Sequence, residues 1–230
     1  MSQQHPSLQH LQRHHRDFAA FREVMVQTAQ GRFDRVFWAM FEQHIMGAVQ
    51  PAELVVDFGT GPGTFLQLAA ERYPALRFVG VDCQPEMVKA AREAVASLGE
   101  RVRFIDADIA HPPIRDLADG SVAGALASMV LHEMPIPTHL LRELARVLRP
   151  RGRVLVYDWI RHPLKTYSAT LPVTASDAAL RDLFEHFSEH CRYTPDDVAF
   201  MAEQCGLQVR DVTVVKDHKH ALWVLEKPGA

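Results

Sequence analysis

This chain of 230 residues has few cysteines and no long apolar run. Its three cysteines, Cys83, Cys191 and Cys205, lie far apart without a C-x-x-C pair, which indicates neither a disulfide framework nor a zinc module. No apolar stretch reaches the roughly 18 residues that a membrane-spanning helix needs. The polar, His-rich N-terminus lacks the apolar segment of a secretory signal. We therefore expect a cytoplasmic protein that makes no contact with a membrane.

A strong positive charge is also missing. The net charge is −3 with the histidines neutral, whereas a dedicated nucleic-acid binder needs a basic face to neutralise phosphates. We therefore expect no nucleic-acid partner. A hydrophobic share of 47% with 23% charged residues is instead ordinary for a globular protein with a substantial core.

The most informative stretch that is present is an apolar run, residues 54–58, that leads into three glycines. Gly59, Gly61 and Gly63 follow it at every second position. A short Val/Leu run is typical of a buried parallel strand, and glycines let the backbone turn tightly and approach a ligand closely. A helix expected over residues 64–72 then points its N-terminal amides into the gap. The stretch indicates a site for an adenine-nucleoside cofactor.

The third glycine separates two cofactor classes. The dinucleotide fingerprint is G-x-G-x-x-G/A, and Thr64 stands where its last glycine is required. Asp57 lies two residues ahead of the first glycine, so the chain reads D-x-G-x-G-x-G. This pattern resembles motif I of the class I methyltransferases that depend on S-adenosyl-L-methionine (SAM). An NAD-dependent oxidoreductase stays open as the alternative.

A second strand is expected over residues 77–81 and ends at Asp82. An acid about 20 residues past the glycines accepts hydrogen bonds from ribose hydroxyls, in SAM and in NAD alike. The residues after it resemble the D-x-S-x-x-M-x-x-x-A-R segment of the SAM family. That resemblance implies that Cys83 lies near the adenine and that Met87 lies on the helix that covers it.

A third strand, residues 102–105, leads into a second pair of acids. By spacing, the resemblance implies that Asp108 meets the adenine amine, with the backbone of Ile109 beside it. Asp106 is the alternative for this role, because a shift of one or two residues is within the accuracy of such spacing.

The fourth strand, residues 122–127, opens into a segment that resembles the S-x-x-L-H-x-x-x/P segment of small-molecule methyltransferases. This resemblance implies that the backbone at Ser128 meets the methionine part of SAM and that His132 faces the substrate. A helix over residues 138–148 then ends at L-R-P-R-G before a fifth strand, residues 154–158, which is another signature of the family.

The resemblance implies an α/β fold with a Rossmann-like, doubly wound, seven-stranded sheet, an antiparallel last strand and helices on both faces. The cofactor it implies is SAM, with S-adenosyl-L-homocysteine as the product. We expect Asp57 at the methionine end and Gly63 at an obligatory turn. The full set of expected cofactor-binding residues is Asp57, Gly59, Thr60, Gly61, Gly63, Asp82, Cys83, Met87, Asp108, Ile109 and Ser128.

The alternation of strands and helices predicts one domain over residues 1–230. We divide it into an N-terminal helical cap (1–50), a cofactor-binding core (51–158), a helical substrate lid (159–193), and a C-terminal helix with an edge hairpin (194–230).

The cap and the lid are expected to define the substrate, a small molecule with an N, O, S or C nucleophile. Aromatic residues recur there at helical spacing, and the connector after residue 158 is long. The alternative is that these aromatics only attach the helices to the sheet. The expected substrate-binding residues are Phe18, Trp38, His132, Trp159 and Tyr167.

Methyl transfer needs a nucleophile held in line and a group that takes its proton. His132 and Glu133 follow the fourth strand and are the expected catalytic residues, with a positional role for His132 as the alternative. A SAM-binding regulator or partner subunit without catalysis would have the same cofactor residues. We expect a monomer or a homodimer.

The 13 histidines do not form a metal motif in the sequence. Only His186 and His190 have helical ligand spacing, and they lack the Glu of H-E-x-x-H. Asp158 ends the fifth strand, the position at which catechol-type methyltransferases bind magnesium, but no further ligands are evident. We therefore expect surface histidines and no metal site.

Overall fold

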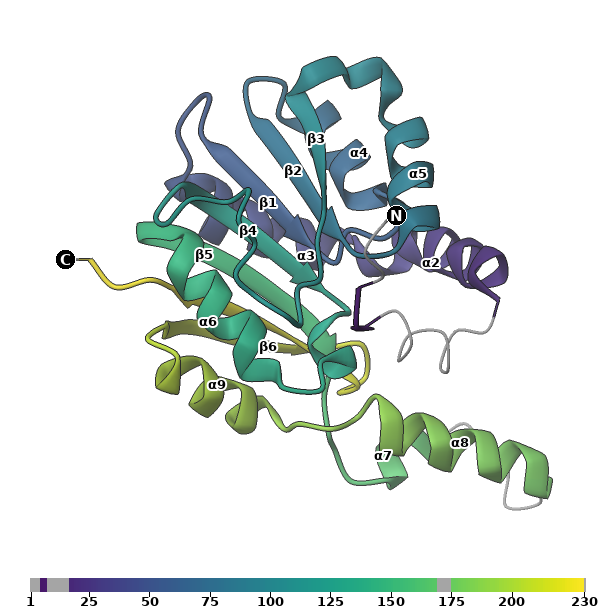
Figure 1. The fold of residues 1–230 in the computed structure, drawn as a ribbon. Helices are drawn as coiled ribbons and strands as arrows, with labels where there is room; N and C mark the ends of the chain where they lie inside the picture. Colours follow the sequence, from purple (N-terminus) through teal and green to yellow (C-terminus); the bar gives the residue numbers. More distant parts are fainter. Residues whose placement is uncertain (1–4, 8–16, 169–174, 230) are drawn as a thin grey trace.

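The computed structural model describes residues 5–7, 17–168 and 175–229 (Figure 1). Its centre is one seven-stranded sheet of order β3-β2-β1-β4-β5-β7-β6. Within the described ranges, no helix has the length and apolar character needed to cross a membrane. The strands are β1 (Leu54–Phe58), β2 (Arg77–Asp82), β3 (Val102–Asp106), β4 (Val122–Ser128), β5 (Leu148–Trp159), β6 (Gln208–Val215) and β7 (His220–Glu226).

The first five strands are parallel, and β7 runs antiparallel to both β5 and β6. The predicted doubly wound sheet with an antiparallel last strand is therefore confirmed. All seven residues of β4 are buried, as expected for a strand covered on both faces. The edge strand β6 instead alternates between exposed and half-buried residues.

Ten helical segments longer than three residues connect and cover the strands in the described ranges. Side chains of Asp17, Asp34, Ser176 and Thr194 cap the N-termini of four of them. These segments are α2 (Phe18–Arg32), α3 (Arg35–Met40), a π-helix (Phe41–Ile45), α4 (Thr64–Arg72), α5 (Pro85–Ala94), a 3-10 segment (Ala96–Arg101), α6 (Pro137–Val147), α7 (Lys165–Ser168), α8 (Asp177–Glu189) and α9 (Pro195–Gln204).

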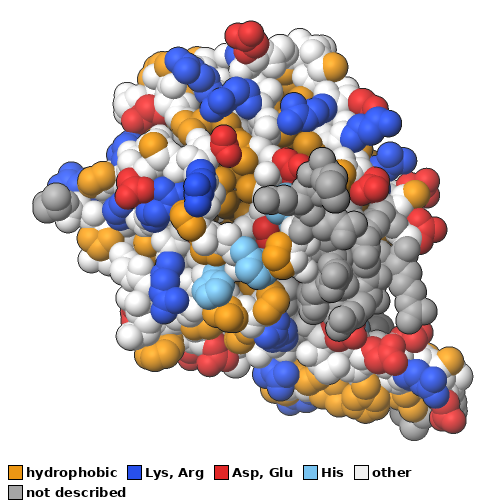
Figure 2. Space-filling view, in the orientation of Figure 1, with side chains coloured by type: hydrophobic (Ala, Val, Ile, Leu, Met, Phe, Trp, Pro, Cys, Tyr) orange, Lys and Arg blue, Asp and Glu red, His pale blue; other side chains and the backbone are white. Residues whose placement is uncertain are grey.

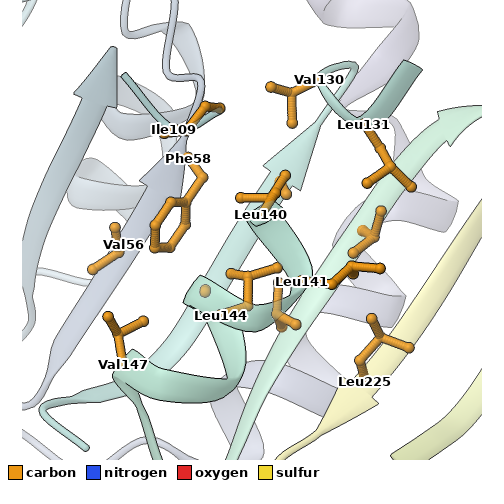
Figure 3. Packing of buried hydrophobic residues seen from close by; sticks show 14 of the residues in the cluster. Val56, Phe58, Ile109, Val130, Leu131, Leu140, Leu141, Leu144, Val147 and Leu225 are labelled. Atoms are coloured by element: carbon orange, nitrogen blue, oxygen red, sulfur yellow. The ribbon is translucent and has the colours of Figure 1, made fainter. Parts of the chain in front are cut away.

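The sheet separates two hydrophobic cores. Figure 3 shows Leu140 and Leu144 of α6 packed toward Val56 of β1, and α9 contributes to the same core. On the other face, Val55 packs with the aromatic residues of α3 and α4. Neighbouring residues of β1 thus enter opposite cores, because successive strand side chains point to opposite faces.

The strand order reverses between β1 and β4, and the crevice at such a switch point is where open α/β sheets bind ligands. The loops after β1, β2, β4 and β5 meet at this edge. Figure 1 also shows α8 extending away from the sheet, and Figure 2 shows hydrophobic side chains gathered over it. Phe184 on α8 is 53% exposed.

The glycine turn after β1 limits how α4 and α5 pack. Gly63 has φ +77, and a Cβ placed on it would lie 2.9 Å from the Cβ of Ala91 on α5. We expect Gly63→Ala to lower the free energy of unfolding by about 1–3 kcal/mol more than Gly206→Ala does. Gly206 has φ +83 but open space around it, so it shares the backbone strain without the clash. Urea unfolding measures both, and equal losses would contradict this packing.

Candidate functional site

A cavity of about 110 Å³ lies at the glycine turn, and we call it the glycine-loop cavity. Seven of the eleven expected cofactor residues line it, and they come from three segments, those at or after the ends of β1, β2 and β3. Asp57, Thr60 and Ser128 line a smaller adjoining hollow. Gly63 lines neither and begins α4 instead. The seven residues in the glycine-loop cavity are Gly59, Gly61, Asp82, Cys83, Met87, Asp108 and Ile109.

Asp82 is fixed at the end of β2 by backbone amides. Its Oδ2 accepts a hydrogen bond from the amide of Gly61 at 2.8 Å, and its Oδ1 accepts one from the amide of Gln84 at 2.9 Å. Burial raises the pKa of Asp82, and these backbone hydrogen bonds oppose the rise. A carboxylate oxygen can accept more than one hydrogen bond, so Asp82 retains acceptor capacity toward the cavity.

The two acids after β3 have different surroundings. Asp108 is buried, lines the glycine-loop cavity, and accepts hydrogen bonds from the amide and hydroxyl of Ser7 at 3.0 and 2.8 Å. Asp106 is exposed and pairs with His5 at 2.9 Å. The geometry therefore favours Asp108 over Asp106 as the acid that faces a ligand.

Two buried side chains at these cavities lack hydrogen-bond partners in the described part of the chain. They are the amide group of Gln84 and the hydroxyl of Ser128. Gln84 lines the glycine-loop cavity and Ser128 lines the adjoining hollow. Buried polar groups are rarely left unpaired, so both mark where a polar ligand would make hydrogen bonds.

Asp57 is the buried acid of the adjoining hollow. Its Oδ2 accepts a hydrogen bond from the Thr60 hydroxyl at 2.8 Å. Burial, together with the charge of Asp82, raises the pKa of Asp57 to about 7, although Thr60 and Arg32 lower it. Arg32, in the last turn of α2, lines the same hollow.

A second cavity of about 530 Å³ adjoins the first, and we call it the histidine cavity. Both cavities are lined by Phe21, Met25, Met129 and Glu133, so they share a wall. Residues from α2, the end of β4, the end of β5, α8 and β7 contribute to it. Its polar and aromatic lining includes Arg32, His132, Glu133, Tyr157, Trp159, His186, His190, Lys216 and His220.

His132 is buried and oriented by Asp158. Its Nδ1 lies 2.5 Å from Asp158 Oδ1, and its Nε2 lies 3.3 Å from Glu133 Oε1. The other Asp158 oxygen accepts hydrogen bonds from three successive amides, those of residues 130–132. Burial lowers the pKa of His132, but Asp158 and Glu133 outweigh it and raise the pKa to about 9.

The expectation of surface histidines on α8 is wrong. His186 and His190 are half-buried, stack with ring centroids 4.6 Å apart, and line the histidine cavity. Burial and neighbouring imidazoles lower the pKa of both, that of His186 to about 4. Ligand atoms of His132, Glu133 and His190 all lie within 4.8 Å of one another, close enough to hold a metal ion.

The expected substrate residues separate into two groups. Trp159 and His132 line the histidine cavity. Trp38 lines neither cavity and stacks on Phe65, with ring centroids 6.0 Å apart, in the core of α3 and α4. Tyr167 lines neither cavity, and its hydroxyl donates to the carbonyl of Ile160. These two predictions are corrected: both aromatics pack the structure.

The side chain of Phe18 lies outside the described residues, so that prediction stays a prediction. Arg32 and Met129 are residues that the sequence did not single out. Met129 lines both cavities with φ +58, a conformation that a non-glycine residue adopts only when its surroundings enforce it. Its place directly after the fourth strand was the one available signal.

The chain is similar to known methyltransferases. A family model described as a methyltransferase domain matches residues 55–152. The arsenite methyltransferase of Halobacterium salinarum is 38% identical over 116 residues, which cover 50% of this chain and 29% of that protein. The trans-aconitate 2-methyltransferase of Azoarcus sp. is 38% identical over 119 residues, which cover 49% of this chain and 44% of that protein.

The matched region thus spans less than half the length of these two curated relatives. Among solved structures, a SAM-dependent methyltransferase from Aquifex aeolicus aligns with a TM-score of 0.57 at 21% identity, covering 82% of this chain and 93% of that one. At this identity the structural match shows the fold alone. Residues 55–152 therefore match a methyltransferase domain, and the strand order of the whole sheet, with its antiparallel last strand, supports a class I SAM-dependent methyltransferase fold for this chain.

Proposed function

We propose that this protein transfers a methyl group from SAM to a small-molecule acceptor bound in the histidine cavity. The observation that carries the proposal is the shared wall of the two cavities at Met129 and Glu133. A donor held along the glycine turn and an acceptor held among the imidazoles would meet at that wall. Relatives named for arsenite and trans-aconitate methylation support a small acceptor.

The residues at the first cavity fit SAM. Asp82 has acceptor capacity for ribose hydroxyls, and the unpaired amide of Gln84 can serve the nucleoside. Asp108 would accept from the adenine amine in place of Ser7, or share its carboxylate with it. Asp57 and Arg32 are suited to the charged methionine end, where the unpaired Ser128 hydroxyl also lies.

SAM supplies a methyl group activated by its sulfonium, which passes to the acceptor's lone pair as S-adenosyl-L-homocysteine is formed and the acceptor's proton is released. The chain's own task is to hold the acceptor in line with that methyl group and to manage the proton. His132 and Glu133 are the polar groups that we propose for this contact. Asp158 is a positioning residue, since it fixes which imidazole nitrogen faces the cavity.

The direct test is formation of S-adenosyl-L-homocysteine from SAM with a panel of small phenols, thiols, amines and carboxylic acids. We expect turnover with at least one class and stoichiometric methylated product. Tight SAM binding without turnover for any class would favour the second candidate, a SAM-binding regulator or partner subunit. A homodimer or monomer remains our expectation for the assembly.

SAM affinity should depend on pH through Asp57. Its raised pKa of about 7 means that it binds a proton below neutral pH, while a cationic ligand favours the ionised form. Affinity should therefore rise up to about tenfold per pH unit from pH 5.5 to 7 and then level off. The charged groups that face Asp57 are Asp82 and Arg32. Burial raises the pKa of Asp82 as well, so the variant at Asp57 is needed to assign the pH dependence. Calorimetric titrations at several pH values test this, and Asp57→Asn should flatten the profile.

A further inference from the structure

We infer that His132, Glu133 and His190 form a binding site for one divalent transition-metal ion, such as Zn²⁺, in the wall of the histidine cavity. The ligand atoms of the three side chains all lie within 4.8 Å of one another. Two imidazoles and one carboxylate are a donor set typical of catalytic zinc and of non-haem iron sites. The sequence spacing does not reveal this set, because His190, at the end of α8, lies about 60 residues after His132 in the chain.

The distances need only a small adjustment. Zinc ligands at about 2.1 Å in a tetrahedral arrangement lie roughly 3.4 Å apart. His132 Nε2 and Glu133 Oε1 already lie 3.3 Å apart. The ring of His190 has its centroid 5.0 Å from that of His132, and its ligand atom lies within 4.8 Å of the other two, so a shift of roughly 1–1.5 Å at this half-buried side chain would complete the site.

Both imidazoles are oriented as metal ligands usually are. A metal-bound histidine donates its other nitrogen to a carboxylate or a backbone carbonyl, which fixes the tautomer. Here Nδ1 of His132 faces the Asp158 carboxylate at 2.5 Å, and Nδ1 of His190 faces the His186 carbonyl at 3.3 Å. In both rings this arrangement directs Nε2 to act as the ligand. Asp158 is itself held by three backbone amides, so the support is rigid.

The site would have open coordination positions, since three protein ligands do not fill a tetrahedral or octahedral shell. These positions face a cavity of about 530 Å³, large enough for a small acceptor. This arrangement points to an acceptor that coordinates the metal through the oxygen of a hydroxyl or the sulfur of a thiol.

The metal's role in methylation rests on the proposed function. Coordination lowers the pKa of the hydroxyl or thiol, whose proton passes to water in the cavity. The lone pair left on oxygen or sulfur forms the new bond to the methyl carbon, and the carbon–sulfonium bond breaks with its electron pair returning to sulfur. The metal keeps its oxidation state throughout, so no oxidant or reductant is required.

The test is calorimetric titration of chelator-treated protein with Zn²⁺, in the presence of a competing chelator that suppresses weak surface sites. We expect one site per chain, weakened roughly 100-fold or more by His190→Ala or by the isosteric Glu133→Gln. His220→Ala is the matched control, because it removes an imidazole from the same cavity whose ring packs on Tyr157 and Trp159 and not on the proposed ligands. It should change Zn²⁺ affinity by less than about fivefold. Co²⁺ absorption provides a second readout of the same ligand set.

The same affinity in the wild type and in His190→Ala, or no stoichiometric site, would overturn this inference. A SAM titration of the same chelator-treated samples separates it from the proposed function. SAM binding without a Zn²⁺ site contradicts the metal inference alone. A Zn²⁺ site that depends on His190, without SAM binding, supports the metal inference and contradicts the proposed cofactor.

Discussion

His132→Ala should lower turnover by about 100-fold or more while leaving the Kd for SAM within about twofold of the wild type. The side chain lines the histidine cavity and does not line the glycine-loop cavity, so its loss removes contact with the acceptor and spares the cofactor. Steady-state kinetics and SAM calorimetry on the same preparation measure the two effects separately.

Two further variants keep this prediction interpretable. His132→Asn keeps an amide that can donate a hydrogen bond to Asp158, so the local structure should be retained. A loss of turnover in this variant is therefore not explained by local unfolding. His218→Ala is the control, because His218 is exposed and does not line the histidine cavity. An equal loss of SAM affinity and turnover in His132→Ala would instead place His132 in the cofactor site and contradict the assignment of the two cavities.

Asp82→Ala should weaken SAM binding by roughly 10- to 150-fold. Hydrogen bonds to a charged group contribute about 1.5–3 kcal/mol each, and 1.4 kcal/mol corresponds to a factor of ten. Asp82 lines the glycine-loop cavity and also accepts from the amides of Gly61 and Gln84. The variant would therefore lose the ribose contact and loosen the glycine turn at once.

The register of the sheet offers a matched control, since Asp82 pairs with Asp106 at the ends of β2 and β3. Asp106 is exposed and does not line the glycine-loop cavity, so Asp106→Ala should leave SAM affinity within about twofold. Asp82→Asn retains the shape and one acceptor oxygen and should give an intermediate loss. Unchanged affinity in Asp82→Ala would count against the proposed position of the ribose.

Much of the cofactor side was predictable because its signals are local. Each signal is a short pattern within a few residues: an apolar run such as β1, a glycine that must adopt positive φ directly after it, or an acid at the end of a strand. Parallel strands bring these ends to one edge, so Gly59, Asp82 and Asp108 meet without any knowledge of distant contacts. Arg151 shows the limit of a residue rule, since it adopts φ +61, a conformation that usually requires glycine.

The acceptor side was less predictable because it depends on contacts between distant segments. Helical spacing gave Trp38 an amphipathic helix but did not show that its side chain faces the core next to Phe65. The same spacing left His190 as a surface residue, although the end of α8 lies against His132. Arg32 likewise reaches the site only because α2 passes the glycine turn. Such contacts follow from tertiary packing, which residue patterns do not specify.

The most direct test of the central claim is calorimetric titration of the purified protein with SAM, S-adenosyl-L-homocysteine and NAD. We predict micromolar binding of SAM and S-adenosyl-L-homocysteine and no binding of NAD, as expected if Thr64 closes the turn to a pyrophosphate. Binding of NAD alone would contradict the proposed function and leave only the doubly wound fold.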